Sequence, residues 1–157
     1  MKSKKTRFAG MLILCFALFR ASGSAQETAQ EPSADDQASV IGCLRTIHTA
    51  ELAYAKANNS FSPNLKALSV PDSGTNNTAS AAGLVDASLG GGKRNGYVFT
   101  YRAGVPDVHG KVSSYAVNAR PVKWQAGVRT FFTDQTGVIR STTENRPATA
   151  RDREIDQ

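Results

Sequence analysis

The sequence predicts an α+β fold: one long N-terminal amphipathic helix packed on an antiparallel sheet of about four strands, with an irregular αβ-loop between them. Residues 38–57 are rich in Ala, Leu and Ile at helical spacing. From residue 97 the pattern changes to short alternating segments of β-forming residues, separated by turns that suit hairpins. A helix laid across one face of such a sheet buries the apolar surface of both, and consecutive hairpins need no crossover connection.

Length and charge limit the class of protein. The chain has 157 residues, which is room for one domain. Its net charge of +6 is unevenly placed, because the first 25 residues hold five of the 19 basic residues and none of the 13 acidic ones. The remainder is nearly neutral and lacks the basic surface that binding to nucleic-acid phosphates requires. The sequence therefore predicts no nucleic-acid partner.

The N-terminus has the pattern of a secretory signal peptide over residues 1–25. A basic segment precedes the apolar run at residues 8–19, and Gly23 and Ala25 fit the small positions before a signal-peptidase site. Cleavage near Ala25 predicts a periplasmic or secreted protein. The alternative is an inner-membrane anchor formed by residues 8–19, a run shorter than the roughly 20 residues of a spanning helix. Residues 26–37 are polar, acidic and contain a proline, which predicts a flexible linker.

The first element of the domain is the helix over residues 38–57, which Asn58 and Asn59 stop. At about 100° per residue, one face of this helix is apolar and the opposite face is polar. The apolar face is formed by Val40, Ile41, Leu44, Ile47, Tyr54 and Ala55, and the polar face by Arg45, Thr49 and Lys56. Glu51 also falls within the apolar stripe, where an ionised carboxylate is costly unless it is paired or hydrogen-bonded.

His48 precedes Glu51 by one helical turn on the same stripe, which leaves two interpretations open. The first is an acid–base or metal pair. The second is a structural carboxylate that accepts hydrogen bonds from a neighbouring loop or an arginine. Two residues form neither a metal site nor a nucleophilic triad, and the other histidine, His109, lies in a separate Gly-rich turn. We therefore predict that the protein is not an enzyme and has no catalytic, metal-binding or cofactor-binding residues.

Cysteine usage adds one prediction. Cys43 is the only thiol left if Cys15 is removed with the signal, so no disulfide can form within the mature chain. Because Cys43 lies within the helical pattern, we expect a small buried apolar side chain. A disulfide between chains and a nucleophilic thiol are the alternatives.

The remaining elements follow in order along the chain. Residues 60–68 are typical of a turn with a short helical piece, whose Phe61, Leu65 and Leu68 return to the core. Residues 71–96 are predicted to be mostly loop, with a short helix over residues 79–89. Strands are predicted at residues 97–102, 113–119, 129–133 and 138–141. Residues 143–157 are polar and highly charged, so we expect a frayed polar tail there.

The segment AELAYAKANNSFSPNLKAL, residues 50–68, resembles the end of the long helix in type IV pilins and type II secretion pseudopilins. In that family the helix runs through a tyrosine into an Asn-Gly-aromatic-Pro-x-x-Leu turn, and the matching residues here are Tyr54, Asn59, Phe61, Pro63, Leu65 and Leu68. Residues 95–104, 114–122 and 129–140 are similar to the hairpins of the same soluble domain. The resemblance covers a pilin-like domain at residues 38–142 and does not include the Gly-Phe-Thr-Leu-Ile-Glu-type segment that begins mature pilins.

The resemblance implies a non-enzymatic exported pilin-like domain with a structural, adhesive or accessory role at a bacterial cell envelope. Its expected partners are envelope proteins, including components of a type IV pilus or a type II secretion system. Contact with the membrane is expected only if the N-terminal segment is retained. Two alternative functions remain: a periplasmic module that binds a small ligand, and a small hydrolase that uses His48 and Glu51.

Overall fold

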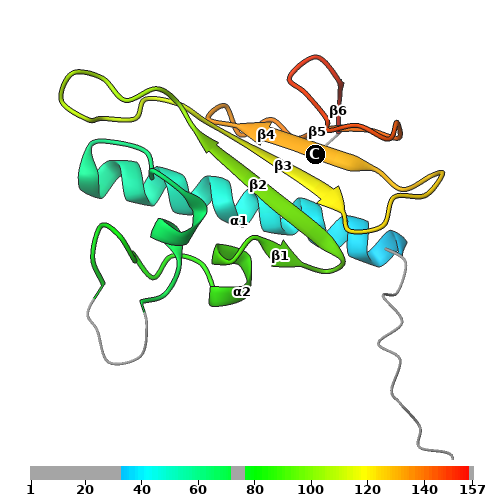
Figure 1. Cartoon of the computed structure of the whole chain (residues 1–157), viewed down its shortest axis with the longest axis horizontal. Helices are drawn as coiled ribbons and strands as arrows, with labels where there is room; N and C mark the ends of the chain where they lie inside the picture. The colour runs from blue at the N-terminus through cyan, green and yellow to red at the C-terminus, as the bar shows by residue number, and fades with distance from the viewer. Residues whose placement is uncertain (1–32, 72–76, 156–157) are drawn as a thin grey trace, which may run out of the picture.

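The computed structural model describes residues 33–71 and 77–155. The predicted signal peptide, its alternative as a membrane anchor, and residues 26–32 of the predicted linker lie outside these ranges. No helix within the two ranges is long and apolar enough to cross a membrane. The predicted α+β class is confirmed: a long helix, α1 (Ala34–Asn58), is followed by an antiparallel sheet that it contacts (Figure 1).

The helix α1 begins at Ala34 rather than at residue 38, so the predicted linker extends too far. The Ser33 hydroxyl accepts a hydrogen bond from the Asp36 backbone N–H, and the Asp36 carboxylate accepts one from the Ser33 backbone N–H. This capping box satisfies donors that the first turn of a helix leaves without partners. At the other end, Asn59 adopts the left-handed conformation with φ of 53° and stops the helix as predicted.

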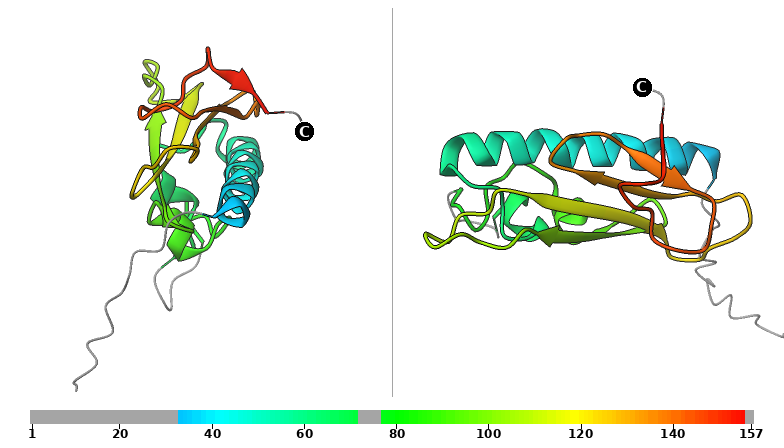
Figure 2. Two further views of the ribbon diagram at one scale, coloured as in Figure 1. Left: turned by 90° about the vertical axis from the view of Figure 1, so that its right-hand side faces the viewer. Right: turned by 90° about the horizontal axis from the view of Figure 1, so that it is seen from above.

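One face of α1 lies along the sheet, and Figure 2 shows the two layers from the side. The buried residues of the helix are Val40, Cys43, Leu44, Ile47, Ala50, Glu51 and Tyr54. The predicted apolar stripe is therefore confirmed along its centre, whereas Ile41 and Ala55 at its margins are only half-buried. The predicted polar face is confirmed as well, since Arg45, Thr49 and Lys56 are exposed.

The sheet has six strands in sequential order, each antiparallel to its neighbour. The strands are β1 (Lys93–Arg94), β2 (Tyr97–Ala103), β3 (Tyr115–Pro121), β4 (Thr130–Asp134), β5 (Arg140–Thr142) and β6 (Arg153–Glu154). The four predicted strands correspond to β2–β5, with ends displaced by one or two residues. The sequence does not predict β1 and β6, because each spans two residues and is too short to show a period.

Side chains along the strands alternate between two faces of the sheet. Tyr115, Val117 and Ala119 of β3 are buried on the inner face, which packs against α1, and the residues between them lie on the outer face. Ala119 pairs with Phe99 of β2 on one side and with Phe131 of β4 on the other. The inward-facing side chains of β2, β3 and β4 are thus in register, and they form the part of the core that the sheet contributes.

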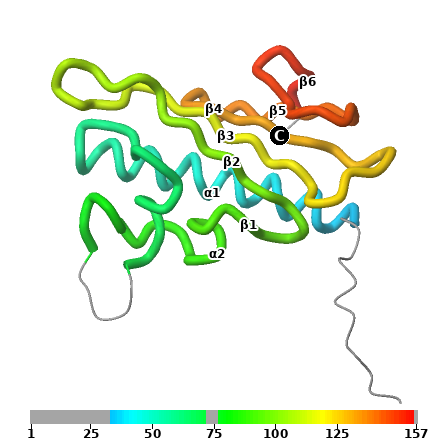
Figure 3. The backbone as a smooth tube through the Cα atoms, in the orientation of Figure 1, coloured from blue at the N-terminus to red at the C-terminus, as the bar shows by residue number. Residues whose placement is uncertain are grey.

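The αβ-loop contains two short helices, η1 (Leu65–Leu68) and α2 (Ala87–Gly90), and Figure 3 traces this green segment to β1. Leu65 and Leu68 are buried in the core, and Phe61 packs against it, as predicted. The predicted helix at residues 79–89 is wrong over most of its length, because helical turns begin only where Asp86 caps α2. Gly90 allows α2 to approach η1 closely, since a Cβ at that position would lie 2.4 Å from the Ser69 Cβ.

The C-terminal segment is folded through Ile155, and the expectation of a frayed tail is wrong. Strand β6 pairs with β5, and the loop between them crosses the outer face of the sheet (Figures 1 and 2). Ala148 in this loop is only 2% exposed. Many polar groups of the segment are bonded to one another and to the strands beneath them, which holds the segment in place despite its charge.

Candidate functional site

Glu51 is held by the chain that follows its own helix. Its side chain is fully buried, and its two carboxylate oxygens accept hydrogen bonds from Ser62: one from the backbone N–H at 3.0 Å and one from the hydroxyl at 2.5 Å. Ser62 is also fully buried. The interpretation of Glu51 as a structural carboxylate that accepts hydrogen bonds from a neighbouring loop is confirmed. The bonds join α1 to the turn that begins the αβ-loop.

The hydrogen bonds continue from Ser62 into the sheet. Tyr101 on β2 donates its phenolic hydrogen to the Ser62 carbonyl oxygen at 2.9 Å. Its ring stacks on that of Tyr115, with centroids 5.7 Å apart and planes at 8°. The Tyr115 hydroxyl in turn lies 2.8 Å from His48 Nδ1. We call these five residues, Glu51, Ser62, Tyr101, Tyr115 and His48, the polar network.

The polar network does not bring His48 and Glu51 together as an acid–base pair. Within the described ranges, His48 bonds to Tyr115 and Glu51 bonds to Ser62. No hydrogen bond between described residues joins His48 to Glu51 directly. The His48 ring is confined on its other side, because a Cβ at Gly137 would lie 2.6 Å from its Nε2. Glu51 and Ser62 are closed to solvent, and the polar network joins the helix, the loop and the sheet.

Burial raises the pKa of every tyrosine in the chain. The sequence contains four tyrosines, and burial is the main cause at each: Tyr54, Tyr97, Tyr101 and Tyr115. The pKa of Tyr97 rises to about 12, and its hydroxyl donates to the Arg129 carbonyl oxygen at 2.9 Å. The neighbouring Glu51 carboxylate adds to the rise in the pKa of Tyr101 and Tyr115.

These shifts predict a loss of stability in alkaline solution. Tyrosines in the unfolded chain ionise near pH 10, whereas the folded protein retains their protons to higher pH. The stabilisation is therefore complete below about pH 10 and decreases as the pH rises toward 12. We expect the ultraviolet signal of tyrosinate to rise together with the loss of circular dichroism, in one transition above pH 10. A tyrosinate signal that develops near pH 10 while the protein stays folded would contradict this prediction.

The other candidate residues from the sequence lie apart from the polar network. Cys43 is 7% exposed and belongs to the core, which confirms the prediction of a small buried apolar side chain, and burial raises the pKa of its thiol. His109 is exposed in the β2–β3 loop, where its backbone N–H donates to Asp107 Oδ1. The described residues contain no group of three His, Cys, Asp or Glu side chains placed to hold a metal ion.

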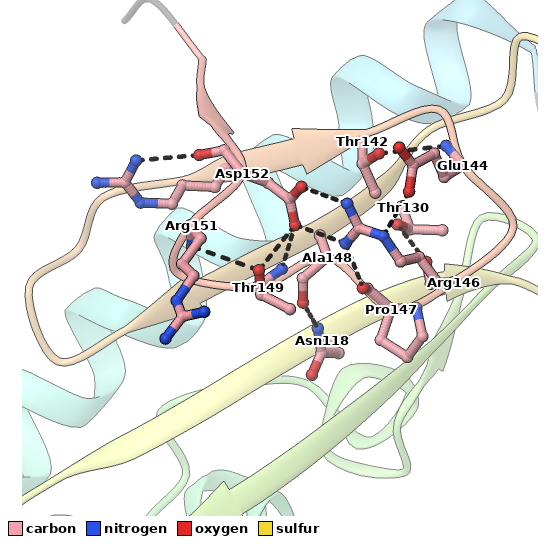
Figure 4. Close-up of polar contacts among 11 residues, drawn as sticks. Asn118, Thr130, Thr142, Glu144, Arg146, Pro147, Ala148, Thr149, Arg151 and Asp152 are labelled. Atoms are coloured by element: carbon pink, nitrogen blue, oxygen red, sulfur yellow. Dashed lines mark hydrogen bonds and ion pairs between the residues drawn. The ribbon is translucent and has the colours of Figure 1, made fainter.

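The loop before β6, residues 143–152, has its own set of ionic contacts (Figure 4). We call this segment the C-terminal loop. The Arg146 guanidinium forms two hydrogen bonds to the Asp152 carboxylate, at 2.8 and 2.6 Å, and a third to Glu144 at 2.6 Å. The Arg146 contact is the main reason why the pKa of Asp152 lies far below its usual range. One guanidinium thus binds both carboxylates, and the three groups together carry one negative charge.

Hydrogen bonds from two strands fix the C-terminal loop to the outer face of the sheet. Asn118 of β3 donates to the Ala148 carbonyl oxygen at 2.6 Å, and Thr130 of β4 donates to the Arg146 carbonyl oxygen at 2.8 Å (Figure 4). Arg120 of β3 donates through Nη2 to Asn145 Oδ1 at 3.1 Å. The loop is therefore a part of the folded domain and forms a wall on its outer face.

A groove of about 560 Å³ lies on the outer face beside this wall. Its lining includes Val98, Arg120, Pro121, Val122, Trp124 and Asn145. Two buried nitrogens of this lining, Arg120 Nε and Trp124 Nε1, have no hydrogen-bond partner among the residues that the structure describes. Buried donors of this kind are rare in folded proteins and call for an explanation. We call this feature the outer groove.

Sequence reasoning did not single out the outer groove. Two signals for it were present: Arg120 directly follows the predicted strand at residues 113–119, and Trp124 is the single tryptophan of the chain, placed shortly after it. The contribution of Asn145 to the groove could not be predicted, because residues 143–157 were expected to be frayed.

Comparison of the chain with protein-family models, with curated proteins and with solved structures finds no match. The function must therefore be inferred from the geometry of the chain itself. Two features bear on it: a polar network whose carboxylate is closed to solvent, and an outer face with an open groove.

Proposed function

We propose that this chain is an exported, non-enzymatic pilin-like domain with a structural, adhesive or accessory role at a bacterial cell envelope. The observation that carries the proposal is the junction between α1 and the αβ-loop. The residues on which the pilin resemblance rests lie there: Tyr54 is buried at the end of the helix, and Leu65 and Leu68 are buried in the turn that follows. A long helix of this kind covers one face of an antiparallel meander.

The burial of Glu51 supports a non-enzymatic role. Glu51 is the acidic residue that a hydrolase using His48 would need, and it is fully buried and bonded to Ser62. A general acid or base must come within hydrogen-bond reach of a substrate proton. The proposed partners are envelope proteins, including pilus or secretion-system components, and they would contact the outer face and the loops that α1 leaves uncovered.

The first test of this proposal is the intact mass of the native protein in separated cell fractions. We expect a mass that begins at Gln26, found in the periplasmic or secreted fraction. A mass that retains residues 8–19 in the membrane fraction would support the anchored form of the same domain. An unprocessed chain in the cytoplasm would contradict an envelope role.

A second candidate function, a small-ligand-binding module, is favoured by the outer groove. Ligand sites are commonly concave, mostly apolar and about 300–1,000 Å³ in volume, with a few polar groups that orient the ligand. The outer groove, at about 560 Å³, combines apolar residues with two donors that have no partner in the described part of the chain. This role is compatible with an envelope location but does not require it.

A further inference from the structure

We infer that the outer groove binds a small organic carboxylate: the carboxylate of the ligand accepts hydrogen bonds from Arg120, and its apolar part lies against Trp124. This inference rests on the second candidate function. It adds the chemical class of the ligand and the residues that would recognise it. It does not depend on export or on a pilin-like role.

Arg120 has a charge that no ion pair within the described residues balances. It lies on the outer face of β3, directly opposite Val98 of β2. Its Nη2 bonds to the neutral side chain of Asn145, and its Nε has no partner in the described ranges. None of the ion pairs found between described residues involves Arg120.

The acidic residues of the C-terminal loop are already bonded to an arginine. Glu144 and Asp152 both bind Arg146, which forms three short hydrogen bonds to them. The described residues that line the outer groove include no aspartate or glutamate. The groove therefore presents one positive charge, with no carboxylate in its described lining to compete for it.

The chemistry of the two unpartnered donors selects an acceptor that carries negative charge. A guanidinium is always protonated and has only donors, and its planar fork matches the two oxygens of a carboxylate. The indole of Trp124 is also a donor only. Both nitrogens are closed to solvent in this structure, so an occupant with acceptor oxygens would satisfy them once the two side chains turn toward it. A protonated amine or a hydrocarbon would satisfy neither.

Apart from Thr100 and Asn145, the rest of the lining is apolar and favours an organic anion over an inorganic one. Val98, Pro121 and Val122 are apolar, and the Trp124 ring adds a large aromatic surface. An inorganic phosphate would cover none of this surface. A carboxylate with a short hydrocarbon chain would cover it and would also place its charged end at Arg120.

The single tryptophan makes the inference directly measurable. Trp124 Nε1 lies below the groove surface, so a ligand must shift the indole to bond with it, and such a shift changes the fluorescence of the protein. We would titrate the purified domain with hexanoate, with hexanamide as the uncharged analogue, and with inorganic phosphate. Hexanoate is expected to give a saturable change, with an affinity at least tenfold above that of hexanamide or phosphate.

The same assay distinguishes two sources of the carboxylate, the C-terminus of a peptide and a free aliphatic acid. A short peptide with an apolar C-terminal residue would be titrated in its free-acid and amidated forms. Tighter binding of the free-acid peptide than of hexanoate identifies the C-terminus of a peptide as the ligand. Tighter binding of hexanoate identifies a free aliphatic acid.

A matched pair of variants tests the role of Arg120. Arg120→Gln should weaken hexanoate binding at least tenfold, and Arg102→Gln should leave it within twofold of the wild type. Arg102 is an exposed arginine on the same face of the sheet, in register with Ala116 and outside the groove lining. Circular dichroism would verify that each variant is folded, and the comparison of hexanoate with hexanamide needs no variant at all.

Each result has one meaning. No response to hexanoate, hexanamide or the peptides would overturn the ligand-binding function itself. Equal affinity for hexanoate and hexanamide would keep that function and overturn the inferred carboxylate. Phosphate binding as tight as hexanoate binding, or an equal loss in Arg120→Gln and Arg102→Gln, would overturn the assignment of an organic carboxylate to Arg120.

Discussion

Replacement of Glu51 by alanine is expected to lower the free energy of unfolding by about 3 kcal/mol. The change removes the acceptor of both Ser62 donors, the backbone N–H and the hydroxyl, in a region without solvent access. A buried donor left without a partner costs about 1–3 kcal/mol, and the cavity left by the side chain adds to the loss. Urea denaturation of the variant and the wild type measures the difference.

The matched control for this substitution is Glu51→Gln. Glutamine keeps the volume of the side chain and one acceptor oxygen, so we expect a smaller loss of about 1 kcal/mol. If the alanine variant unfolds at the same urea concentration as the wild type, the polar network does not hold α1 to the αβ-loop. A glutamine variant that stays fully stable but loses a hydrolytic activity of the wild type would instead restore the interpretation of His48 and Glu51 as catalytic.

Replacement of Phe131 by alanine should have a still larger effect, a loss of about 4 kcal/mol in the free energy of unfolding. The Phe131 side chain is 0% exposed and lies on the inner face of β4. Its ring is 5.9 Å from that of Tyr97, also buried, so truncation leaves a cavity at the centre of the sheet. Thermal or urea denaturation measures the loss.

The adjacent residue provides a control in the same strand. Phe132 points to the outer face and is only half-buried, so Phe132→Ala should cost about 1 kcal/mol. A shift of the strand register by one residue would exchange the two faces. If Phe132→Ala proves as damaging as Phe131→Ala, the assignment of Phe131 to the inner face and Phe132 to the outer face is wrong.

Most of the elements that sequence reasoning predicted correctly have a clear period; β5, with three residues, was predicted from the hairpin turn before it. The spacing of apolar residues in α1 and the alternation in β2–β4 both extend over enough residues to distinguish helix from strand. The strand β6 has two residues and the helix α2 has four, and segments this short cannot show a repeating pattern of apolar residues. Their positions depend on local caps and on pairing with segments already folded.

The C-terminal loop was mispredicted for a different reason. Its composition is that of a disordered tail, because composition counts charges without showing which of them are paired. In the folded protein Arg146 binds Glu144 and Asp152, and Asn118 and Thr130 bind the loop backbone. These contacts depend on three-dimensional placement, which the order of residues alone does not reveal.

The candidate site was predicted only in part. The position of Glu51 within an apolar stripe indicates that it requires a partner, but does not indicate which one. Ser62 lies only 11 residues further along the chain, at a turn whose geometry brings it back to the helix. The outer groove depends on three separate segments, at Val98, at residues 120–124 and at Asn145, so no local pattern could predict it.

The sheet ends on each side in a strand of only two residues, β1 and β6. Long regular edges expose rows of unpaired backbone groups to which another chain can add a strand. Strands as short as these offer a second molecule very few such groups, so extension of the sheet through β1 or β6 is disfavoured. We therefore expect a partner of this protein to recognise its side chains, on the faces and loops of the domain, rather than to add a strand to β1 or β6.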